Sequence, residues 1–329
     1  MRPPSLGGLF FLRNQVSRIV SMQMRATKLT ITILLSLFVW SCSVFEESAH
    51  SVRPRIFSEG EKTGIIESVG LTESSGIAAS RCTDDLLWSH NDSGKEPVLY
   101  AFNFKGKASG SYMLTDAENI DWEDIAIIEN KESCDIYIAD IGNNYSLRNR
   151  LSIYVVSEPK LTYGSTDSVK LKSRRIDFSY DLPPNSKVPD AETLMVHPTT
   201  KDIYIITKTK SGAATIFRIL NRELGVENVM ARKVASVSVP SIPPGLLTGG
   251  DISPDGMRVA LVDYLGAYEF SLTKPSDDFI SIFDTKPVLI RFGRRTQGES
   301  ITYSKDGDSL YGTSEGANSS VIRSTARND

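Results

Sequence analysis

The sequence is poor in the residues that build soft-metal and nucleophilic sites, since its 329 residues include three cysteines and three histidines. This scarcity argues against a zinc site, which needs several cysteine or histidine ligands close together. The sequence also contains no Gly-x-Ser-x-Gly elbow, no P-loop, no dinucleotide-binding fingerprint and no nucleophilic Cys/His pair. The enzyme classes that these motifs mark are therefore excluded.

Clustered basic residues are missing from most of the chain. The first 41 residues contain five of the 37 Lys and Arg residues and no acid, so the rest has 32 basic and 40 acidic side chains, a net charge of −8. A nucleic-acid partner would need clustered Lys and Arg beside its phosphates, and this acidic balance argues against one. After residue 41, no apolar stretch is long enough to span a membrane.

The N-terminal segment has the features of an export signal. Its basic residues precede an apolar run of 12 residues from Leu29 to Trp40, which is too short to span a bilayer and typical of a signal-peptide core. The motif Val39-Trp40-Ser41-Cys42 resembles a bacterial lipobox, which predicts lipidation of Cys42. The alternative is an ordinary secretory signal cleaved nearby, and Met22 or Met24 is an alternative start.

These features predict the domain organisation. We predict a lipoprotein-type signal peptide over residues 1–41, a polar tether over residues 42–54 and a single folded domain over residues 55–329. The mature protein is expected to be exported and lipid-anchored to the bacterial cell envelope, at the outer membrane or facing the periplasm. The membrane, reached through the N-terminal lipid, is its first expected partner.

Five short segments of the chain start in the same way. Each has an acidic or hydroxyl residue at the same place, usually two residues before an aliphatic one and with a second acid two places earlier. These residues are spaced 48, 69, 56 and 51 positions apart, and a recurrence of about fifty residues indicates a repeat architecture. The five are Ser75, Glu123, Glu192, Thr248 and Glu299.

Each repeat contains short β-branched and aromatic runs broken by Gly, Asp, Asn and Pro, the pattern of four strands. Four strands per unit, repeated radially, predict an all-β fold, a β-propeller. The fifth repeat lacks its outer strand, which a stretch within Arg55–Val69 would supply and so close the ring. We predict five four-stranded blades. Six blades are the alternative if the long second repeat hides an extra sheet rather than a long loop over Glu158–Asp167.

Two groups of polar residues are predicted to meet at one mouth of the propeller channel, because the start of an innermost strand and the turn after the second strand open on the same face. Nearly all members of both groups are acids, amides or hydroxyls. The strand starts contribute Glu73, Ser75, Asp121, Glu123, Asp124, Asp190, Glu192, Thr248, Asp251, Gln297 and Glu299. The ends of the second strands contribute His90, Asn91, Asp92, Asp140, Asn143, Lys208, Asp263, Tyr264 and Glu315.

Carboxylates gathered in this way repel one another by about 4 kcal/mol per pair at 4 Å and an effective dielectric constant of 20. Bound protons, a cation such as Lys208, Arg148 or Arg150, or a divalent metal would relieve the repulsion. An all-oxygen ligand set suits Ca²⁺ or Mg²⁺ better than Zn²⁺. The expected metal ligands are Glu123, Glu192, Glu299 and Asp251.

A structural interpretation stands beside the metal site, since one acid per blade would also serve to accept backbone N–H groups and fix the turns. If the site is catalytic, His90 or Asp92 would move the proton and Lys208 would stabilise developing charge. His90 is equally consistent with a hydrogen-bonded turn residue. The expected ligand-binding residues are Glu73, Ser75, Asn91, Asp140, Asn143, Asp263, Tyr264 and Glu315.

Cys82 and Cys134 each follow the first strand of a repeat by a similar distance. Loops at equivalent positions of adjacent repeats lie on one face, and export would place both residues in an oxidising compartment. A disulfide between them is therefore geometrically possible. The alternative is two unpaired thiols.

The order of several motifs resembles a group of exported bacterial β-propellers. These are Glu-Ser-Ser-Gly-Ile (73–77), Leu-Trp-Ser-His-Asn-Asp-Ser-Gly (87–94), Asp-Trp-Glu-Asp-Ile-Ala (121–126), Tyr-Ile-Ala-Asp-Ile-Gly-Asn-Asn (137–144), Asp-Ala-Glu-Thr-Leu (190–194) and Gly-Glu-Ser-Ile-Thr (298–302). Over about residues 65–320 the chain is similar to the SdiA-regulated family and to the esterase-like phytase propellers. The phytase-like resemblance implies Ca²⁺ and a phosphoester substrate, with Glu123, Glu192 and Glu299 as candidate metal ligands.

The sequence therefore favours a lipid-anchored propeller that binds a small molecule or a protein at an acidic, Ca²⁺-binding channel mouth. One alternative is a metal-dependent hydrolase of phosphoester or ester bonds at the same mouth. A structural scaffold without a site is the other. Whether the protein is an enzyme is left open by the sequence.

Overall fold

The computed structural model describes residues 52–131, 133–161, 168–275, 277–293 and 297–327. The chain divides into two compact units, Met1–His50 and Ser51–Asp329, and the described residues belong to the second. The predicted signal peptide, Cys42 and most of the tether lie outside the described residues. Within the described ranges, no helix combines the length and apolar character that crossing a membrane requires.

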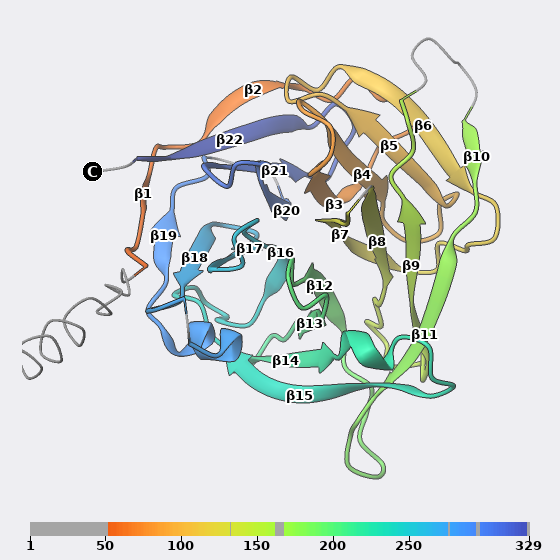
Figure 1. Cartoon of the computed structure of the whole chain (residues 1–329), viewed down its shortest axis with the longest axis vertical. Helices are drawn as coiled ribbons and strands as arrows, with labels where there is room; N and C mark the ends of the chain where they lie inside the picture. The colour runs from red at the N-terminus through yellow and green to blue at the C-terminus, as the bar shows by residue number, and fades with distance from the viewer. Residues whose placement is uncertain (1–51, 132, 162–167, 276, 294–296, 328–329) are drawn as a thin grey trace, which may run out of the picture. The chain divides into compact units, whose positions relative to one another are not determined.

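The regular secondary structure of the described residues is almost entirely β-strand, and the strands fall into five antiparallel groups (Figure 1). The first group is β3 (Ser74–Ala79), β4 (Leu87–Asn91), β5 (Val98–Phe102) and β6 (Ala108–Leu114). The second is β7 (Trp122–Glu129), β8 (Cys134–Asp140), β9 (Leu151–Ser157) and β11 (Arg174–Tyr180). The third is β12 (Ala191–Val196), β13 (Ile203–Thr207), β14 (Ala214–Ile219) and β15 (Val229–Val237).

The last two groups complete the ring. The fourth is β16 (Leu247–Ile252), β17 (Arg258–Asp263), β18 (Ala267–Ser271) and β19 (Val288–Ile290). The fifth is β20 (Gly298–Tyr303), β21 (Ser309–Ser314) and β22 (Ser320–Arg327), to which β1 (Ile56–Phe57) and β2 (Glu61–Ile65) are added. Two 3-10 helices, η1 (Asn221–Glu223) and η2 (Phe279–Asp284), lie in connecting segments.

The five innermost strands surround the centre of the molecule (Figure 1). β3 contacts β7, β7 contacts β12, β12 contacts β16, β16 contacts β20, and β20 contacts β3, so the contacts close into a ring. With the four-stranded antiparallel groups arranged around this ring, the fold is a β-propeller. The predicted fold class is confirmed.

The hydrophobic core is divided among the interfaces between neighbouring groups. Five clusters of buried side chains fill the five interfaces, from the one between the first and second groups to the one between the fifth and first. Each innermost strand is therefore covered on both faces, and only the last residue of β7 among these strands is exposed. Burial on both faces explains apolar runs such as Ile125–Ile128, where a half-exposed strand would alternate.

The N-terminal stretch pairs with the last strand, as the sequence predicted. β2 lies antiparallel to β22, with Glu61 opposite Arg323 and Ile65 opposite Ser320. The second repeat is the longest and has two strands after β9. β10 (Val169–Leu171) pairs with β6 of the first group, and the end of β11 pairs with β15 of the third. The extra length of this repeat thus forms edge pairings with its neighbours on both sides.

Cys82 and Cys134 form a disulfide with their Cα atoms 5.9 Å apart. The bridge joins the turn after β3 to the start of β8, and so ties the first group to the second. Beside it, Glu158 accepts hydrogen bonds from Ser80 Oγ (2.9 Å) and from Trp88 Nε1 (2.7 Å). These contacts fasten the face of the ring where the innermost strands end.

Candidate functional site

A β-bulge interrupts each innermost strand near its start, where the strand pairs with the second strand of its group. In β7 the register moves from Trp122 opposite Asp140 to Asp124 opposite Ala139, which leaves Glu123 as the extra residue. Bulges re-aim the side chain of the extra residue and are frequent beside functional sites. The register shifts fall at Ser75-Gly76, Glu123, Glu192, Thr248 and Glu299. The sequence repeat is therefore a repeated bulge.

The hydroxyl residues at these bulges fasten neighbouring groups together. Ser75 Oγ donates to the carbonyl of Glu123 at 2.7 Å, and Thr248 Oγ1 donates to the carbonyl of Gly298 at 2.9 Å. Ser75 was expected to bind a ligand, but its hydroxyl is buried and donates to the neighbouring strand. This assignment is corrected, because the hydrogen bond occupies its donor.

Three carboxylates come together at the start of the second group. Asp92, Asp121 and Glu123 each offer an oxygen within 4.8 Å of the other two. We call this set the carboxylate triad. Burial and the negative charge of Asp92 raise the pKa of Asp121 to about 6. Burial and the charge of Glu192 raise the pKa of Glu123 well above its ordinary value. The ionised forms of Asp121 and Glu123 are therefore destabilised by burial and by neighbouring acids, and no nearby cation among the described residues balances these effects.

The backbone of Gly142 approaches this triad closely. A Cβ atom at this position would lie 2.1 Å from Glu123 Oε1 and 2.3 Å from Asp121 Oδ2. Contacts this short are not tolerated, so only glycine leaves both carboxylates in place. The motif Asp140-Ile141-Gly142-Asn143 therefore shapes one wall of the site.

The triad differs from other buried acids of the molecule in its hydrogen bonds. Among the described residues, the side chains of Asp121 and Glu123 accept no hydrogen bond from the backbone, and Asp92 accepts one from the adjacent Ser93 N at 2.6 Å. Asp124, the residue after the bulge, accepts from Ile125 N (2.8 Å), Leu194 N (3.0 Å) and Gly250 N (3.3 Å). Turn-fixing and strand-linking therefore account for Asp124 and do not account for Asp121 and Glu123.

Lys208 supplies a cation beside the triad. Its ammonium group forms an ion pair with Glu192 and lies 5.1 Å from the centre of the Tyr264 ring. Burial raises the pKa of Glu192 to about 7 although the ammonium of Lys208 opposes this shift. Burial alone would lower the pKa of Lys208, but the charge of Glu192 and its hydrogen bond outweigh burial and raise it. The expected proximity of Lys208 and Tyr264 to the acids is thus present.

Glu299 is the third bulge glutamate and is also buried, with 5% of its surface exposed. Its Oε1 has no hydrogen-bond partner among the described residues. Burial and the charge of Glu192 raise the pKa of Glu299 to about 8. Further out, Glu73 and Glu315 form an isolated backbone bridge between the first and fifth groups, and Glu73 pairs with Lys95 at 3.5 Å. We call this face, with the triad and Glu192, Glu299, Glu73, Glu315, Asp190 and Lys208, the acidic mouth.

The structure does not bring Asp251 to the acidic mouth, which corrects its assignment as a metal ligand. Asp251 lies three residues past the bulge of β16, about 10 Å along the strand. Its Oδ2 accepts hydrogen bonds from Arg81 Nη2 (2.8 Å), Thr302 Oγ1 (2.9 Å) and Tyr303 N (2.9 Å). Both its position and its partners identify a structural carboxylate.

His90 is also corrected, because it belongs to the core. The ring is fully buried and packs edge-on against Trp122 with 5.5 Å between ring centres. Nδ1 lies 3.0 Å from the carbonyl of Asn91, and burial lowers the pKa of His90 to about 4. A side chain without exposed surface does not exchange protons with a molecule at the mouth. Its role as a general base is therefore not supported by the geometry.

The remaining residues at the ends of the second strands hold the acidic loops in place. Asn91 Oδ1 accepts from the backbone N–H groups of Thr72 (2.8 Å) and Glu73 (3.0 Å), and Asp140 Oδ1 accepts from Asp121 N (3.0 Å). Their predicted contact with a ligand is corrected to a positioning role, because these acceptors are occupied by the segment that leads into the innermost strand of the same group. The ion pair of Asp140 with Arg148 (2.8 Å) fixes the loop after β8, where Arg148 Nη1 also donates to the carbonyl of Gly142 at 2.8 Å.

Two further predicted ligand-binding residues, Asn143 and Asp263, fix turns. Asn143 Nδ2 donates to the carbonyls of Arg148 and Val188 at 3.1 and 3.3 Å. Asp263 accepts from Leu265 N (2.8 Å), Gly266 N (2.7 Å) and Tyr268 Oη (2.9 Å). Such turn contacts are common for Asp and Asn after a strand.

Asp121 and Asp190 were placed at the mouth by the sequence pattern but were given no ligand role. Each stands two residues before a bulge glutamate, and this doubled spacing was the available signal. Asp190 Oδ1 accepts from Asn143 N at 2.7 Å, which links the second and third groups. A cavity of about 390 Å³ lies beside Asp190 and Lys208. Gly142 was not singled out, because its close approach depends on the loop conformation.

Comparison with known proteins leaves the activity open. No protein-family model matches the chain, and no curated protein does. Among solved structures, the chain is similar to a gluconolactonase from Xanthomonas campestris, with 11% identity, a TM-score of 0.45, and coverage of 84% of this chain and 96% of that chain. It is also similar to a chain of a nidogen/laminin complex, with 13% identity, a TM-score of 0.39, and coverage of 73% and 72%. Similarities this remote assign no activity.

Proposed function

We propose that this propeller binds a divalent cation of the Ca²⁺ type at Asp92, Asp121 and Glu123, and a ligand or partner through the same acidic mouth. The observation that carries the proposal is the carboxylate triad, whose oxygens lie within 4.8 Å of one another, while the carboxylates of Asp121 and Glu123 accept no hydrogen bond from the described backbone. Carboxylates that fasten nothing in the fold are available to a ligand.

The donor set fits a hard cation. Ca²⁺ takes six to eight oxygen ligands and tolerates irregular geometry, whereas Mg²⁺ requires a near-octahedral arrangement. Three carboxylates would supply part of the Ca²⁺ shell and leave positions for oxygens of a bound molecule. The room that Gly142 leaves beside Glu123 and Asp121 supports this fit. The raised pKa values of Asp121 and Glu123 express the same unbalanced charge that a cation would neutralise.

Exposed apolar side chains on the same face support a protein as the bound partner. The five most exposed large apolar residues among the described ones are between 78% and 95% exposed. All five lie in segments that lead into innermost strands or join second to third strands, which are on the face of the acidic mouth. Apolar side chains on one face offer surface that a protein partner would remove from water. The five are Val69, Tyr145, Leu147, Ile242 and Leu265.

A metal-dependent hydrolase is the second candidate. It is favoured by acids that titrate near neutrality, since the pKa values of Asp121 and Glu192 are raised by burial to about 6 and about 7. Such values suit general acid–base chemistry. With His90 in the core, a mouth carboxylate such as Asp92 would move the proton, and Lys208 would stabilise developing charge.

Export and anchoring through Cys42, and the resemblance to the SdiA-regulated and phytase-like families, remain parts of the proposal.

Calcium-dependent stability tests the proposed function. We expect Ca²⁺ to raise the melting temperature of the purified protein, with EDTA reversing the rise, since a ligand at 100 times its Kd adds about 2.7 kcal/mol. Glu123→Gln should remove the response, and the exposed Glu227→Gln is the matched control. An absent Ca²⁺ response, or unfolding of Glu123→Gln in place of a lost response, would contradict the proposal. A phosphatase and esterase screen of the Ca²⁺-loaded protein separates the two candidates.

A further inference from the structure

A second cavity lies where the innermost strands end, on the face opposite the acidic mouth. Its volume is about 280 Å³. Every one of the five strand groups contributes to its lining, so it is centred on the ring rather than on one blade. The lining consists of Arg81, Ile127, Ile128, Glu129, Val196, Pro198, Thr199, Ile252, Pro254 and Lys305. We call this cavity the axial cavity.

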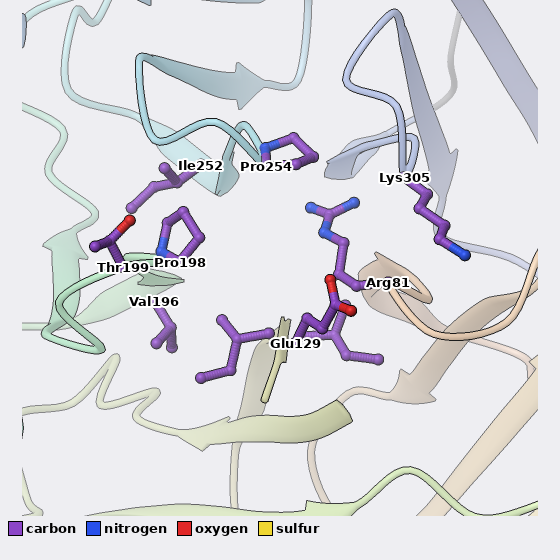
Figure 2. Close-up of a pocket in the computed structure, with 10 residues that line it drawn as sticks. Arg81, Glu129, Val196, Pro198, Thr199, Ile252, Pro254 and Lys305 are labelled. Atoms are coloured by element: carbon purple, nitrogen blue, oxygen red, sulfur yellow. The ribbon is translucent and has the colours of Figure 1, made fainter. Parts of the chain in front are cut away.

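The walls of the axial cavity are mostly aliphatic. Ile127, Ile128, Val196 and Ile252 are buried and form the last part of three innermost strands. Two prolines add apolar surface at the edge (Figure 2). A molecule that enters would therefore remove apolar surface from water, which is favourable in proportion to the area covered.

One buried cation interrupts these apolar walls. Arg81 is 6% exposed, and its guanidinium extends toward the side of the cavity where Pro254 lies (Figure 2). Its Nη1 donates to the carbonyl of Tyr303 at 2.5 Å and its Nη2 to Asp251 Oδ2 at 2.8 Å. A guanidinium carries five N–H donors, and these two bonds are the ones it makes among the described residues. The group is thus held rigidly and keeps donors for another acceptor.

The other charges at the cavity are exposed. Lys305 points away from the remaining lining residues in Figure 2 and pairs with Asp84 at 2.9 Å. Glu129 is the single acid in the lining, where it stands against the two cations Arg81 and Lys305. Apolar walls with one rigid, donor-rich cation select a ligand that has an apolar body and one anionic oxygen group.

We propose that the axial cavity binds a small carboxylic acid with an apolar body, its carboxylate on the free N–H groups of Arg81 and its body against Ile127, Val196 and Ile252. The fixed fork of a guanidinium matches the two oxygens of a carboxylate. A phosphate ester, which is larger, would fit this volume less well. The site is separate from the triad, because it lies at the other end of the innermost strands. The proposal for the axial cavity therefore does not depend on Ca²⁺ binding at the triad.

Ligand-detected fluorine NMR tests this site on the purified protein. The probe is 4-fluorophenylacetate, and its matched neutral probe is 4-fluorophenylacetamide. We expect line broadening of the acid that saturates with concentration, and at least tenfold weaker binding of the amide. Thr199→Trp, which places an indole at the cavity edge, should weaken binding of the acid at least tenfold, whereas Thr200→Trp on the neighbouring exposed residue should leave it within twofold.

Arg81→Lys gives a second test that does not depend on filling the cavity. It keeps the positive charge beside Asp251 but removes the fork, so binding of the acid should weaken while the fold, checked by circular dichroism, is retained. Absence of saturable binding of 4-fluorophenylacetate to the wild-type protein would overturn the proposal. Equal binding of the acid and the amide, or unchanged binding to Thr199→Trp, would overturn it as well.

Discussion

The two ends of the propeller channel use charge in opposite ways. At the acidic mouth, carboxylates are crowded, and those of Asp121 and Glu123 accept no hydrogen bond from the described backbone. At the axial cavity, the buried charge of Arg81 is matched by Asp251 and a backbone carbonyl. The same five strands connect both ends. Charges are therefore paired where the innermost strands end, which stabilises the fold, and the carboxylates of Asp121 and Glu123 form no ion pair within the described residues where these strands begin.

The contrast is sharpest between adjacent residues. Asp124 accepts three backbone hydrogen bonds and links three innermost strands, β7, β12 and β16. Glu123, one position earlier, is the extra residue of the bulge, and its carboxylate links none of the described strands. A bulge shifts the side-chain alternation by one residue, so neighbours in sequence serve the core and the mouth respectively.

Removing Asp251 should have the largest effect on stability. Asp251→Ala leaves the guanidinium of Arg81 buried without its carboxylate, and breaking such a pair costs about 3–5 kcal/mol. Asp121→Asn at the acidic mouth should cost less than about 1 kcal/mol or stabilise the protein, since it removes repulsion. Urea unfolding of both variants measures the difference. Equal losses would remove the distinction between the two ends.

Loss of the disulfide should come next. Replacing Cys82 and Cys134 by alanine removes a cross-link on the face of the axial cavity and should cost about 2–4 kcal/mol. The Ca²⁺ response at the acidic mouth should remain within twofold. Thermal unfolding with and without Ca²⁺ provides both readings. A lost Ca²⁺ response would mean that the two ends are coupled.

The stability of the metal-free protein should fall as the pH rises from about 5 to about 8. The pKa of Glu299 is raised by burial to about 8, so the folded chain holds a proton that the unfolded chain has released above about pH 4.5. Folding takes up this proton, and the free energy of unfolding decreases by up to about 1.4 kcal/mol per pH unit until the folded group ionises. Melting temperatures in EDTA measure the slope. Glu299→Gln should flatten it, and an unchanged slope would contradict the assignment.

Gly142→Ala should change stability little. The new Cβ would collide with the carboxylates of Glu123 and Asp121, which would move at a cost of about 1 kcal/mol. The displaced carboxylates would no longer hold the cation together. Ca²⁺ affinity should therefore fall at least tenfold by calorimetry. Gly225→Ala, which meets no atom within 4 Å, is the control and should leave affinity unchanged.

The sequence predicted the ring better than the site. Equivalent acids at spacings near fifty residues revealed the repeats, and the unpaired fifth repeat indicated closure by the N-terminal stretch. The bulges were not predictable, because register depends on how each strand meets its partner. Asp251 was therefore assigned to the mouth although it lies farther along β16.

Burial was the second quantity that the sequence could not supply. His90 follows an apolar run and precedes polar residues. A shift of one residue in the strand pairing would therefore decide whether its side chain is buried or exposed. Trp122, contributed by the next group, covers it. The hydrogen bonds of Asn91 and Asp140 likewise involve segments 18 to 19 residues earlier, which sequence spacing did not connect.

The pairing of β2 with β22 has a consequence for biosynthesis. Glu61 can pair with Arg323 only after residue 323 has been made, so one edge of the first strands stays open until then. Contacts so distant in sequence slow folding, and an open edge invites pairing with other chains. A nascent chain on the ribosome is thus an open ring until the eight-residue strand β22 (Ser320–Arg327) has been made and closes it.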